Sequence, residues 1–330
     1  MRRQIINIGC IVFLQLSTQQ VFSQDVAFSA PDYAQLTVNP AMAGSVNDLQ
    51  ANMSYRNQWK RFGGAYNSMT ASAEMVFRKT KTKNDSYLAG GFDLVTDNSG
   101  TSKFNSTTLR TSLAYHLQIS PYERLSVGMY LGYIGVNSSV DNARWGSQYD
   151  GVDYNSTLIS GEVTPSNQKS NVDLGFGTVF SSYSDMKDKS PSFQMGFAMY
   201  HLNRPNLSPF ASHDSRLPIR SAGFINLSVP LGPKNCELRP SIYLQMQNKF
   251  VYLLMGSMYS YSLNKTSKES VSAGLFYRSS GAIVTRAAYQ RSNWNFGLTY
   301  ELNMGGKMGV VGMRSASEVS LRYFIPTLKK

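Results

Sequence analysis

Leu-Gln-Ala-Asn-Met-Ser-Tyr-Arg-Asn-Gln, residues 49–58, alternates apolar and polar side chains with a period of two. Because successive side chains of a β-strand point to opposite faces, this strand would present one apolar and one polar face. The apolar face carries Leu49, Ala51, Met53 and Tyr55. The polar face carries Gln50, Asn52, Ser54, Arg56 and Gln58. An apolar outward face and a polar inward face are typical of strands that cross a membrane in a β-barrel.

The same alternation recurs along the chain in segments of about ten residues, separated by turn-type residues. Counting these segments over residues 48–330 predicts an all-β transmembrane outer-membrane β-barrel of about 14 antiparallel strands. Charged side chains keep to the polar face in several of them, at Arg56, Glu74, Arg78, Asp93, Arg110 and Asp173. These charges either pair across the lumen and fill it or line a pore, and the sequence leaves both interpretations open.

The composition excludes a helical membrane protein. Only 16% of the 330 residues are charged, below the quarter usual in soluble domains, and the mean hydropathy is −0.26. A spanning helix needs about 20 consecutive apolar residues, and no such run follows residue 23. A soluble β-sandwich is the alternative, since the 20 tyrosines suit either fold. A closed barrel is favoured because an apolar outward face recurs on all the strands, and closure leaves no unpaired backbone groups in lipid.

The connections between the predicted strands fall into two classes. The three longest lie near 138–170, 203–217 and 303–316, and all follow odd-numbered strands. Connections after even-numbered strands are mostly short, for example Ser120-Pro121-Tyr122 and Leu231-Gly232-Pro233. Outer-membrane barrels have short periplasmic turns and long surface loops. The first strand is therefore predicted to begin on the periplasmic side.

Residues 1–23 have the features of a secretory signal peptide. Arg2 and Arg3 form a basic start, an apolar stretch follows, and cleavage is predicted before Gln24. Cys10 would leave with this peptide, so Cys236 alone could form no internal disulfide. The net charge of +12 suits anionic lipid head groups or an acidic partner. Export argues against nucleic acid as a partner.

No catalytic or metal-binding motif is recognisable in the sequence, so we expect no enzyme, no cofactor and no metal. The three histidines, His116, His201 and His213, are far apart in the chain. Ser212, His213 and Asp214 are adjacent, but adjacency in sequence is not the geometry of a catalytic triad. A polar loop is the ordinary explanation for them.

Residues 24–47 lack alternation and precede the first strand. They either shape the entry to the barrel, through Asn39, Pro40 and Gly44, or form a periplasmic plug or docking segment. Trp59 suits an anchor at the membrane interface, with a partner contact as the alternative.

Two adjacent motifs resemble the PorP/SprF family of type IX secretion membrane proteins. Residues 35–44, Gln-Leu-Thr-Val-Asn-Pro-Ala-Met-Ala-Gly, are similar to that family's Asn-Pro-Ala-x-Ala-Gly motif, through Asn39, Pro40, Ala41 and Gly44. Arg56, Gln58 and Trp59 are similar to its Arg-x-Gln-Trp segment. Weaker similarities include Leu125-Ser126-Val127-Gly128, Leu174-Gly175-Phe176-Gly177 and Tyr277-Arg278. Where the family often has Ser-His-Glu, this chain has Ala316-Ser317-Glu318.

The resemblance implies an outer-membrane barrel that supports type IX secretion or the cell-surface anchoring of large proteins such as adhesins, in gliding-type bacteria. It implies as partners the outer-membrane lipid, other type IX components, the C-terminal region of a secreted surface protein and a periplasmic peptidoglycan-binding protein. From the residues alone, an outer-membrane porin or hydrophobic-solute transporter is the alternative function.

Overall fold

The computed structural model describes residues 25–58, 66–77, 86–99, 104–137, 146–159, 168–184, 192–208, 216–231, 235–264, 269–304 and 315–325. Most of these residues are in strands, and short helices occur near the N-terminus and in one connection. The helices are η1 (Pro31–Tyr33), α2 (Gln35–Val38), η2 (Pro40–Met42) and η3 (Gly146–Gln148). None of the helices in these ranges is long and apolar enough to cross a membrane.

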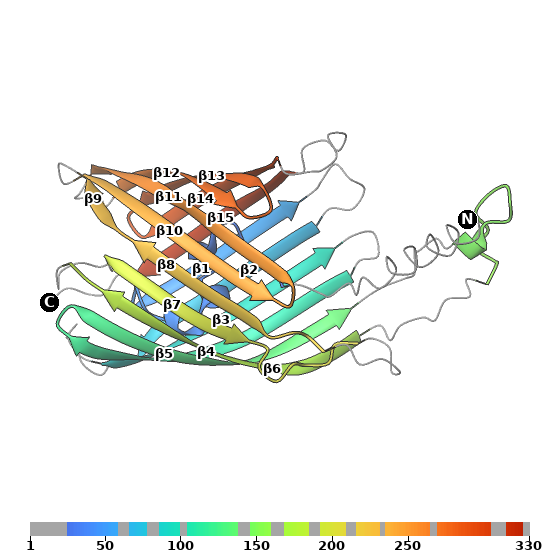
Figure 1. Ribbon diagram of the computed structural model, residues 1–330, viewed down its shortest axis with the longest axis horizontal. Helices are drawn as coiled ribbons and strands as arrows, with labels where there is room; N and C mark the ends of the chain where they lie inside the picture. The colour runs from blue at the N-terminus through green and yellow to red at the C-terminus, as the bar shows by residue number, and fades with distance from the viewer. Residues whose placement is uncertain are drawn as a thin grey trace, which may run out of the picture.

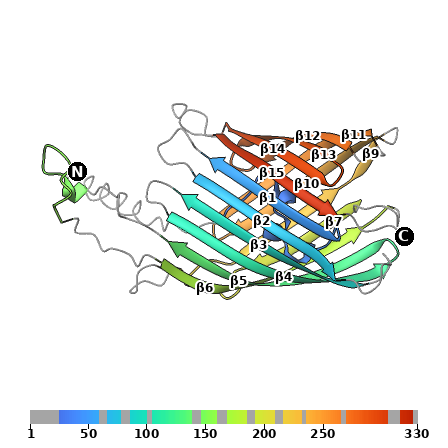
Figure 2. The same cartoon turned by 180° about the vertical axis from the view of Figure 1, so that it is seen from behind.

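Antiparallel strands form one sheet that closes on itself (Figures 1 and 2). The strands are β1 (Leu49–Gln58), β2 (Tyr66–Phe77), β3 (Tyr87–Ser99), β4 (Phe104–Ser120), β5 (Glu123–Asn137), β6 (Gln168–Ser182), β7 (Phe193–Tyr200), β8 (Arg220–Leu227), β9 (Val229–Leu231), β10 (Cys236–Gln247), β11 (Phe250–Asn264), β12 (Glu269–Arg278), β13 (Ala282–Arg291), β14 (Trp294–Asn303) and β15 (Ser315–Ile325). Neighbours in sequence pair with each other, and β1 pairs with β15 to close the ring.

β8 and β9 are two parts of one interrupted strand, because both pair with β10. Pairing of β10 with β9 ends at Leu238 and pairing with β8 begins at Ser241, so Pro240 lies in the gap. Proline has no N–H to donate to a ladder, and an interruption tolerates it. Counting β8 and β9 together gives a closed antiparallel barrel of 14 strands, and the predicted fold class is confirmed.

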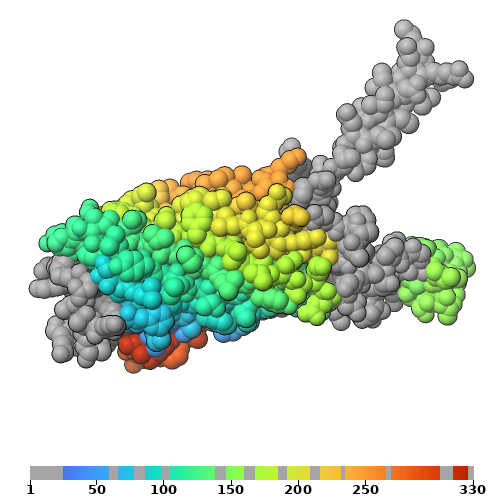
Figure 3. Space-filling view, turned by 90° about the horizontal axis from the view of Figure 1, so that it is seen from below, coloured from blue at the N-terminus to red at the C-terminus, as the bar shows by residue number. Residues whose placement is uncertain are grey.

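The alternation of side chains across the wall also follows the sequence. In β5 the outward-facing Val127, Met129, Leu131 and Tyr133 are exposed, whereas the residues between them are buried. Figure 3 shows one side of this wall as a continuous surface of strand side chains. In a membrane barrel, lipid covers the apolar side chains that a soluble protein would bury in its core. The exposed apolar face is therefore what an outer-membrane barrel requires.

The longest connections all leave the same end of the barrel, which we call the loop end. They run over residues 138–167, 201–219 and 304–314. The opposite end, where β1 begins, is the turn end. It has tight turns at 121–122 and 292–293, but its connections at 78–86 and 183–192 are longer than the sequence analysis predicted. The predicted difference in connection length between the two ends therefore holds for the three longest connections and only in part for the others.

Residues 25–47, which we call the inner segment, lie inside the barrel (the blue chain in Figure 1). The segment starts at the loop end, where Asp25 contacts His201, and finishes at the turn end, where Asn47 contacts Gln50 of β1. Nearly all of its side chains from Phe28 to Ser45 are buried. The segment therefore crosses the lumen before the chain enters the wall.

Candidate functional site

The inner segment is held by hydrogen bonds from many sides of the barrel. Its backbone carbonyl groups accept from Tyr252 of β11 at Phe28, from Tyr200 of β7 at Leu36, from Arg220 of β8 at Thr37 and from His116 of β4 at Ala43. Short helices leave several backbone groups without partners of their own, and buried groups of this kind must be satisfied elsewhere. The wall supplies these partners, so the conformation of the segment depends on the barrel around it.

Asn39, Pro40 and Ala41 rest on three glycines of the wall, Gly128 of β5, Gly177 of β6 and Gly196 of β7. We call these three glycines the glycine seat. A Cβ atom at Gly128 would lie 2.6 Å from the backbone N of Ala41, and one at Gly177 would clash with Asn39 Oδ1. Any larger residue would occupy the space that the inner segment fills. The glycines are required because two backbones approach each other closely here.

The Asn39 side chain is fully buried and uses its whole carboxamide. Its Nδ2 donates to the carbonyl oxygens of Thr178 (3.0 Å) and Phe197 (3.1 Å), and its Oδ1 accepts from the N–H of Ala41 (2.9 Å). The last bond caps η2, and Pro40 occupies the first position of that helix, where a missing N–H costs nothing. Asn39 therefore fixes the helix and joins it to two wall strands.

Gly44 ends the helical part of the inner segment in a left-handed conformation, with φ of +68°. Its N–H donates to Glu74 of β2 (3.1 Å), and its carbonyl accepts from the Tyr87 hydroxyl (3.1 Å). A Cβ atom here would lie 2.6 Å from that of Ala89. Both the backbone conformation and the lack of space select glycine at this position.

Arg56 of β1 lies at the centre of a buried ionic cluster where β1, β12, β14 and β15 meet the inner segment. Its Nη1 lies 2.8 Å from Glu301 Oε1 and 3.7 Å from Glu318 Oε2, and Arg278 Nη1 lies 2.7 Å from Glu301 Oε2. Glu318 accepts from the N–H groups of Ser29 (2.9 Å) and Ala30 (3.2 Å). Two positive and two negative side chains thus neutralise one another and hold the inner segment.

A second charged cluster lies near the loop end. Arg110 donates to Asp93 from Nε at 3.0 Å, and the imidazole of His201 lies between Asp173 (Nδ1 to Oδ1, 2.9 Å) and Asp25 (Nε2 to Oδ2, 2.7 Å). Both ring nitrogens face carboxylates, so the doubly protonated form fits best. Burial alone lowers the pKa of His201, but the two carboxylates outweigh burial and raise the pKa above 6.5.

The charged lumen residues therefore pair and anchor the inner segment. This is the first of the two interpretations that the sequence left open, and it holds for Arg56, Asp93, Arg110 and Asp173. Glu74 instead accepts from the Gly44 N–H of the inner segment. Arg78 lies outside the described residues. Within the described residues, no group of three or more His, Cys, Asp and Glu side chains is arranged to hold a metal ion.

The structure brings most of the candidate residues from the sequence to the inner segment or its contacts. Asn39, Pro40, Ala41 and Gly44 meet the wall, while Arg56 and Arg278 share Glu301. Tyr277 faces outward and is half exposed, and Gln58 ends β1. Trp59, the Ser212-His213-Asp214 stretch and the predicted signal peptide, residues 1–23, lie outside the described residues.

Glu301, His201 and Asp25 were not predicted from the sequence as members of the charged clusters. Glu301 has a detectable signal, because it lies on the polar face of an alternating strand, as Arg56 does. Asp25 and His201 lie in segments without alternation, so no periodic pattern points to them. Their proximity depends on closure of the barrel.

The profile of the family described as Type IX secretion system membrane protein PorP/SprF matches residues 20–323. The chain belongs to the PorP/SprF family. The Asn-Pro-Ala-x-Ala-Gly motif of this PorP/SprF protein is the part of the inner segment that contacts the glycine seat and β2–β3. Two of the weaker motifs supply Gly128 and Gly177 of that seat. The family and fold are those of a secretion-system membrane barrel in the outer membrane, and not those of an enzyme family.

Solved structures share the fold of the PorP/SprF chain at low identity. The toluene transporter TbuX of Ralstonia pickettii is 9% identical, with a TM-score of 0.50 over 88% of this chain and 93% of TbuX. A deletion mutant of the monoaromatic hydrocarbon channel TodX is 10% identical, with a TM-score of 0.50 over 90% of this chain and 94% of that one. Among curated proteins none matches. These similarities establish the barrel fold only.

We expect Asn39→Ala to reduce the free energy of unfolding by about 1–3 kcal/mol, because two wall carbonyls and the Ala41 N–H lose their partner in a buried site. Urea-induced unfolding of the purified barrel in detergent would measure the loss. Asn47→Ala is the matched control, since the half-buried Asn47 donates to Gln50 (2.7 Å) at the turn end and to no other group among the described residues. Equal stability of the two variants would contradict the anchoring role of Asn39.

Proposed function

We propose that this PorP/SprF protein is an outer-membrane accessory scaffold of the type IX secretion system, which supports the secretion or cell-surface anchoring of large surface proteins such as adhesins. The observation that carries the proposal is the inner segment, which crosses the lumen and is fastened to the wall by buried ion pairs and the glycine seat. A lumen occupied in this way suits a scaffold better than a pore. Family membership supports the connection to the secretion machine.

The two ends of the barrel have different roles in this proposal. The loop end faces the cell surface, because long connections in outer-membrane barrels are extracellular. There the connections 138–170 and 203–217 bind the C-terminal region of the exported protein. The turn end faces the periplasm and contacts other type IX components, including a peptidoglycan-binding protein. Residues 1–23 direct export as a signal peptide, and residues 24–47 act as the plug.

Replacement of residues 141–165 by a Gly-Ser linker tests the role of the loop end. We expect cells with this variant to lose the surface protein from the cell envelope, because its docking surface is gone while the wall is intact. Immunofluorescence of whole cells and immunoblots of the culture medium would measure retention and release. The matched control replaces 185–190 at the turn end with the same linker.

The result separates the two ends only if the barrel itself is present in equal amounts. Heat-modifiable migration of the barrel in gels would verify this in both strains. Normal surface retention with residues 141–165 replaced would reject the loop end as the docking surface. Normal retention in a strain that lacks the whole gene would reject the anchoring function.

A hydrophobic-solute transporter is the second candidate. It is supported by the fold shared with TbuX and TodX, which are named as a toluene transporter and a monoaromatic hydrocarbon channel. A cavity near the loop end, which is lined in part by apolar side chains, also favours it. Planar-bilayer recordings separate the scaffold from a porin, because a plugged scaffold gives no steady conductance. Uptake of toluene by liposomes would favour the transporter over the scaffold.

A further inference from the structure

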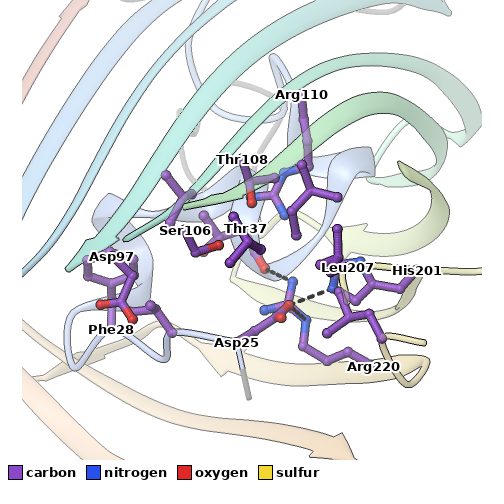
Figure 4. A pocket seen from close by; sticks show the side chains of 15 residues that line it. Asp25, Phe28, Thr37, Asp97, Ser106, Thr108, Arg110, His201, Leu207 and Arg220 are labelled. Carbon is purple, nitrogen blue, oxygen red and sulfur yellow. Dashed lines mark hydrogen bonds and ion pairs between the residues drawn. The ribbon is translucent and has the colours of Figure 1, made fainter. Parts of the chain in front are cut away.

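A small cavity lies between the inner segment and the wall at the loop end (Figure 4). Its volume is about 70 Å³, which is enough for a few waters or one small organic group. Apolar side chains line one part of it, and they come from β3, β5 and the 201–219 connection: Val95, Ile134, Val136, Leu207 and Leu217. Charged side chains line the other part. The cavity is thus small, amphipathic and built from segments far apart in sequence.

The charged part contains a carboxylate bound by two buried cations. Asp25 Oδ2 lies 2.7 Å from His201 Nε2 and 3.2 Å from Arg220 Nε. Figure 4 shows these three side chains directed toward one another. Gln247 completes the site: its Nε2 lies 3.4 Å from Asp25 Oδ1, and its Oε1 accepts from the Asp25 N–H at 2.9 Å. Asp25 belongs to the inner segment, whereas its partners belong to the wall and a connection.

The other described carboxylates near the two cations have partners of their own. Asp97, which also lines the cavity, accepts from the Ser68 hydroxyl (2.6 Å). Asp93 is bound by Arg110, and Asp173 accepts from the Tyr130 hydroxyl (3.0 Å) and faces the other nitrogen of His201. Arg220 also donates to the Thr37 carbonyl (3.0 Å), and its guanidinium lies over the Tyr200 ring, which holds it in place. Without Asp25, Arg220 would be a fixed, buried positive charge without a carboxylate beside it, and His201 would keep only Asp173 as a carboxylate partner. Buried charges of this kind bind an anion strongly.

We propose that His201, Arg220 and Gln247 form a carboxylate-binding site at the loop end, which Asp25 occupies in the closed state and which a small external carboxylate occupies when Asp25 leaves. The ligand class follows from the lining. A carboxylate meets the cations, and a short apolar group meets Val95, Ile134 and Leu217. A free monocarboxylic acid and the C-terminal carboxylate of a peptide both have this chemistry. The proposal does not depend on the secretion role of the protein.

Chemical rescue of Asp25→Ala tests the site. We expect this variant, as the full chain in detergent, to unfold at a lower temperature than the wild type. Sodium acetate or propionate at about 100 mM should restore at least half of that loss, because the carboxylate replaces the missing one. Sodium chloride at equal ionic strength and acetamide, which has the shape without the charge, are the controls. The same salts should change the unfolding temperature of the wild type little, since Asp25 fills the site in that protein.

A second variant keeps the test decisive if Asp25→Ala is little destabilised. Asp25→Ala combined with Arg220→Gln removes one of the two cations and should lose the rescue, while heat-modifiable migration verifies that the barrel is folded. If acetate stabilises Asp25→Ala no more than chloride does, or stabilises the double variant equally, the site does not exist as proposed.

Labelled pentapeptides that end in Ala-Val distinguish the two sources of the carboxylate. Fluorescence polarisation with the Asp25→Ala barrel would compare the free acid with its C-terminal amide. Binding of the free acid about tenfold or more above the amide supports a peptide terminus as the ligand, because the amide lacks the charge. Rescue by propionate without peptide binding supports a free solute. Failure of both would overturn the proposal, and the loss of surface retention expected above would be unaffected.

Discussion

Arg56→Ala should reduce the free energy of unfolding by about 3–5 kcal/mol, because it leaves two buried carboxylates without their central cation. Arg56 is 1% exposed, and its partners Glu301 and Glu318 are equally buried. Arg278 would remain beside Glu301 only. Glu318 would keep the N–H groups of Ser29 and Ala30, which do not neutralise a charge. The ionic cluster should therefore lose its stabilising effect as a whole. The start of the inner segment should then no longer be held to the wall.

Equilibrium unfolding in urea, followed by tryptophan fluorescence and heat-modifiable migration, would measure the effect. Arg239→Ala is the matched control. It removes an arginine from a strand, but the pair of Arg239 with Glu237 is about half exposed and 3.9 Å apart, so a change within about 0.5 kcal/mol is expected. Adding Glu318→Gln to Arg56→Ala should recover part of the loss by removing the unpaired charge, because Glu301 keeps Arg278 as its partner. A loss as small as that of Arg239→Ala would refute the role assigned to the cluster.

The wall of the barrel was predictable because alternation is a local property. Whether Met53 or Ser54 faces lipid can be predicted from the neighbouring residues alone. The same rule applies to every strand segment. The interruption between β8 and β9 was not predictable, since residues 225–229 alternate without a break and the gap appears only opposite Pro240. Alternation defines the face of a residue but not the strand that lies beside it.

The partners of the lumen charges were not predictable for the same reason. Arg56 was correctly placed on the inner face, yet Glu318 reaches it only because β15 closes the ring against β1. The motif residues of the inner segment presented another difficulty. Asn39 and Gly128 were noticed separately, through the family resemblance, and nothing local indicates that one rests on the other. Their contact depends on the curvature of the whole wall, which no short pattern encodes.

Gly128→Val should loosen the inner segment and give the barrel a steady conductance that the wild type lacks. A Cβ atom at Gly128 would lie 2.6 Å from both N and Cα of Ala41, which are backbone atoms and cannot rotate away. Overpacking of this kind typically costs about 1–3 kcal/mol. The strain is relieved most directly by displacing the inner segment from the glycine seat, because the wall is held by its ladder on both sides.

Planar-bilayer recordings and limited proteolysis of residues 25–47 would detect this displacement. Gly135→Val is the matched control on the same strand, because the nearest atom to a Cβ atom there, Tyr133 Cε1, is 3.7 Å away. Conductance from Gly128→Val but not from Gly135→Val would mean that the seat keeps the lumen closed. Equal conductance from the wild type would instead mean that solutes pass the seated inner segment, and the pore would then explain the protein better than the scaffold.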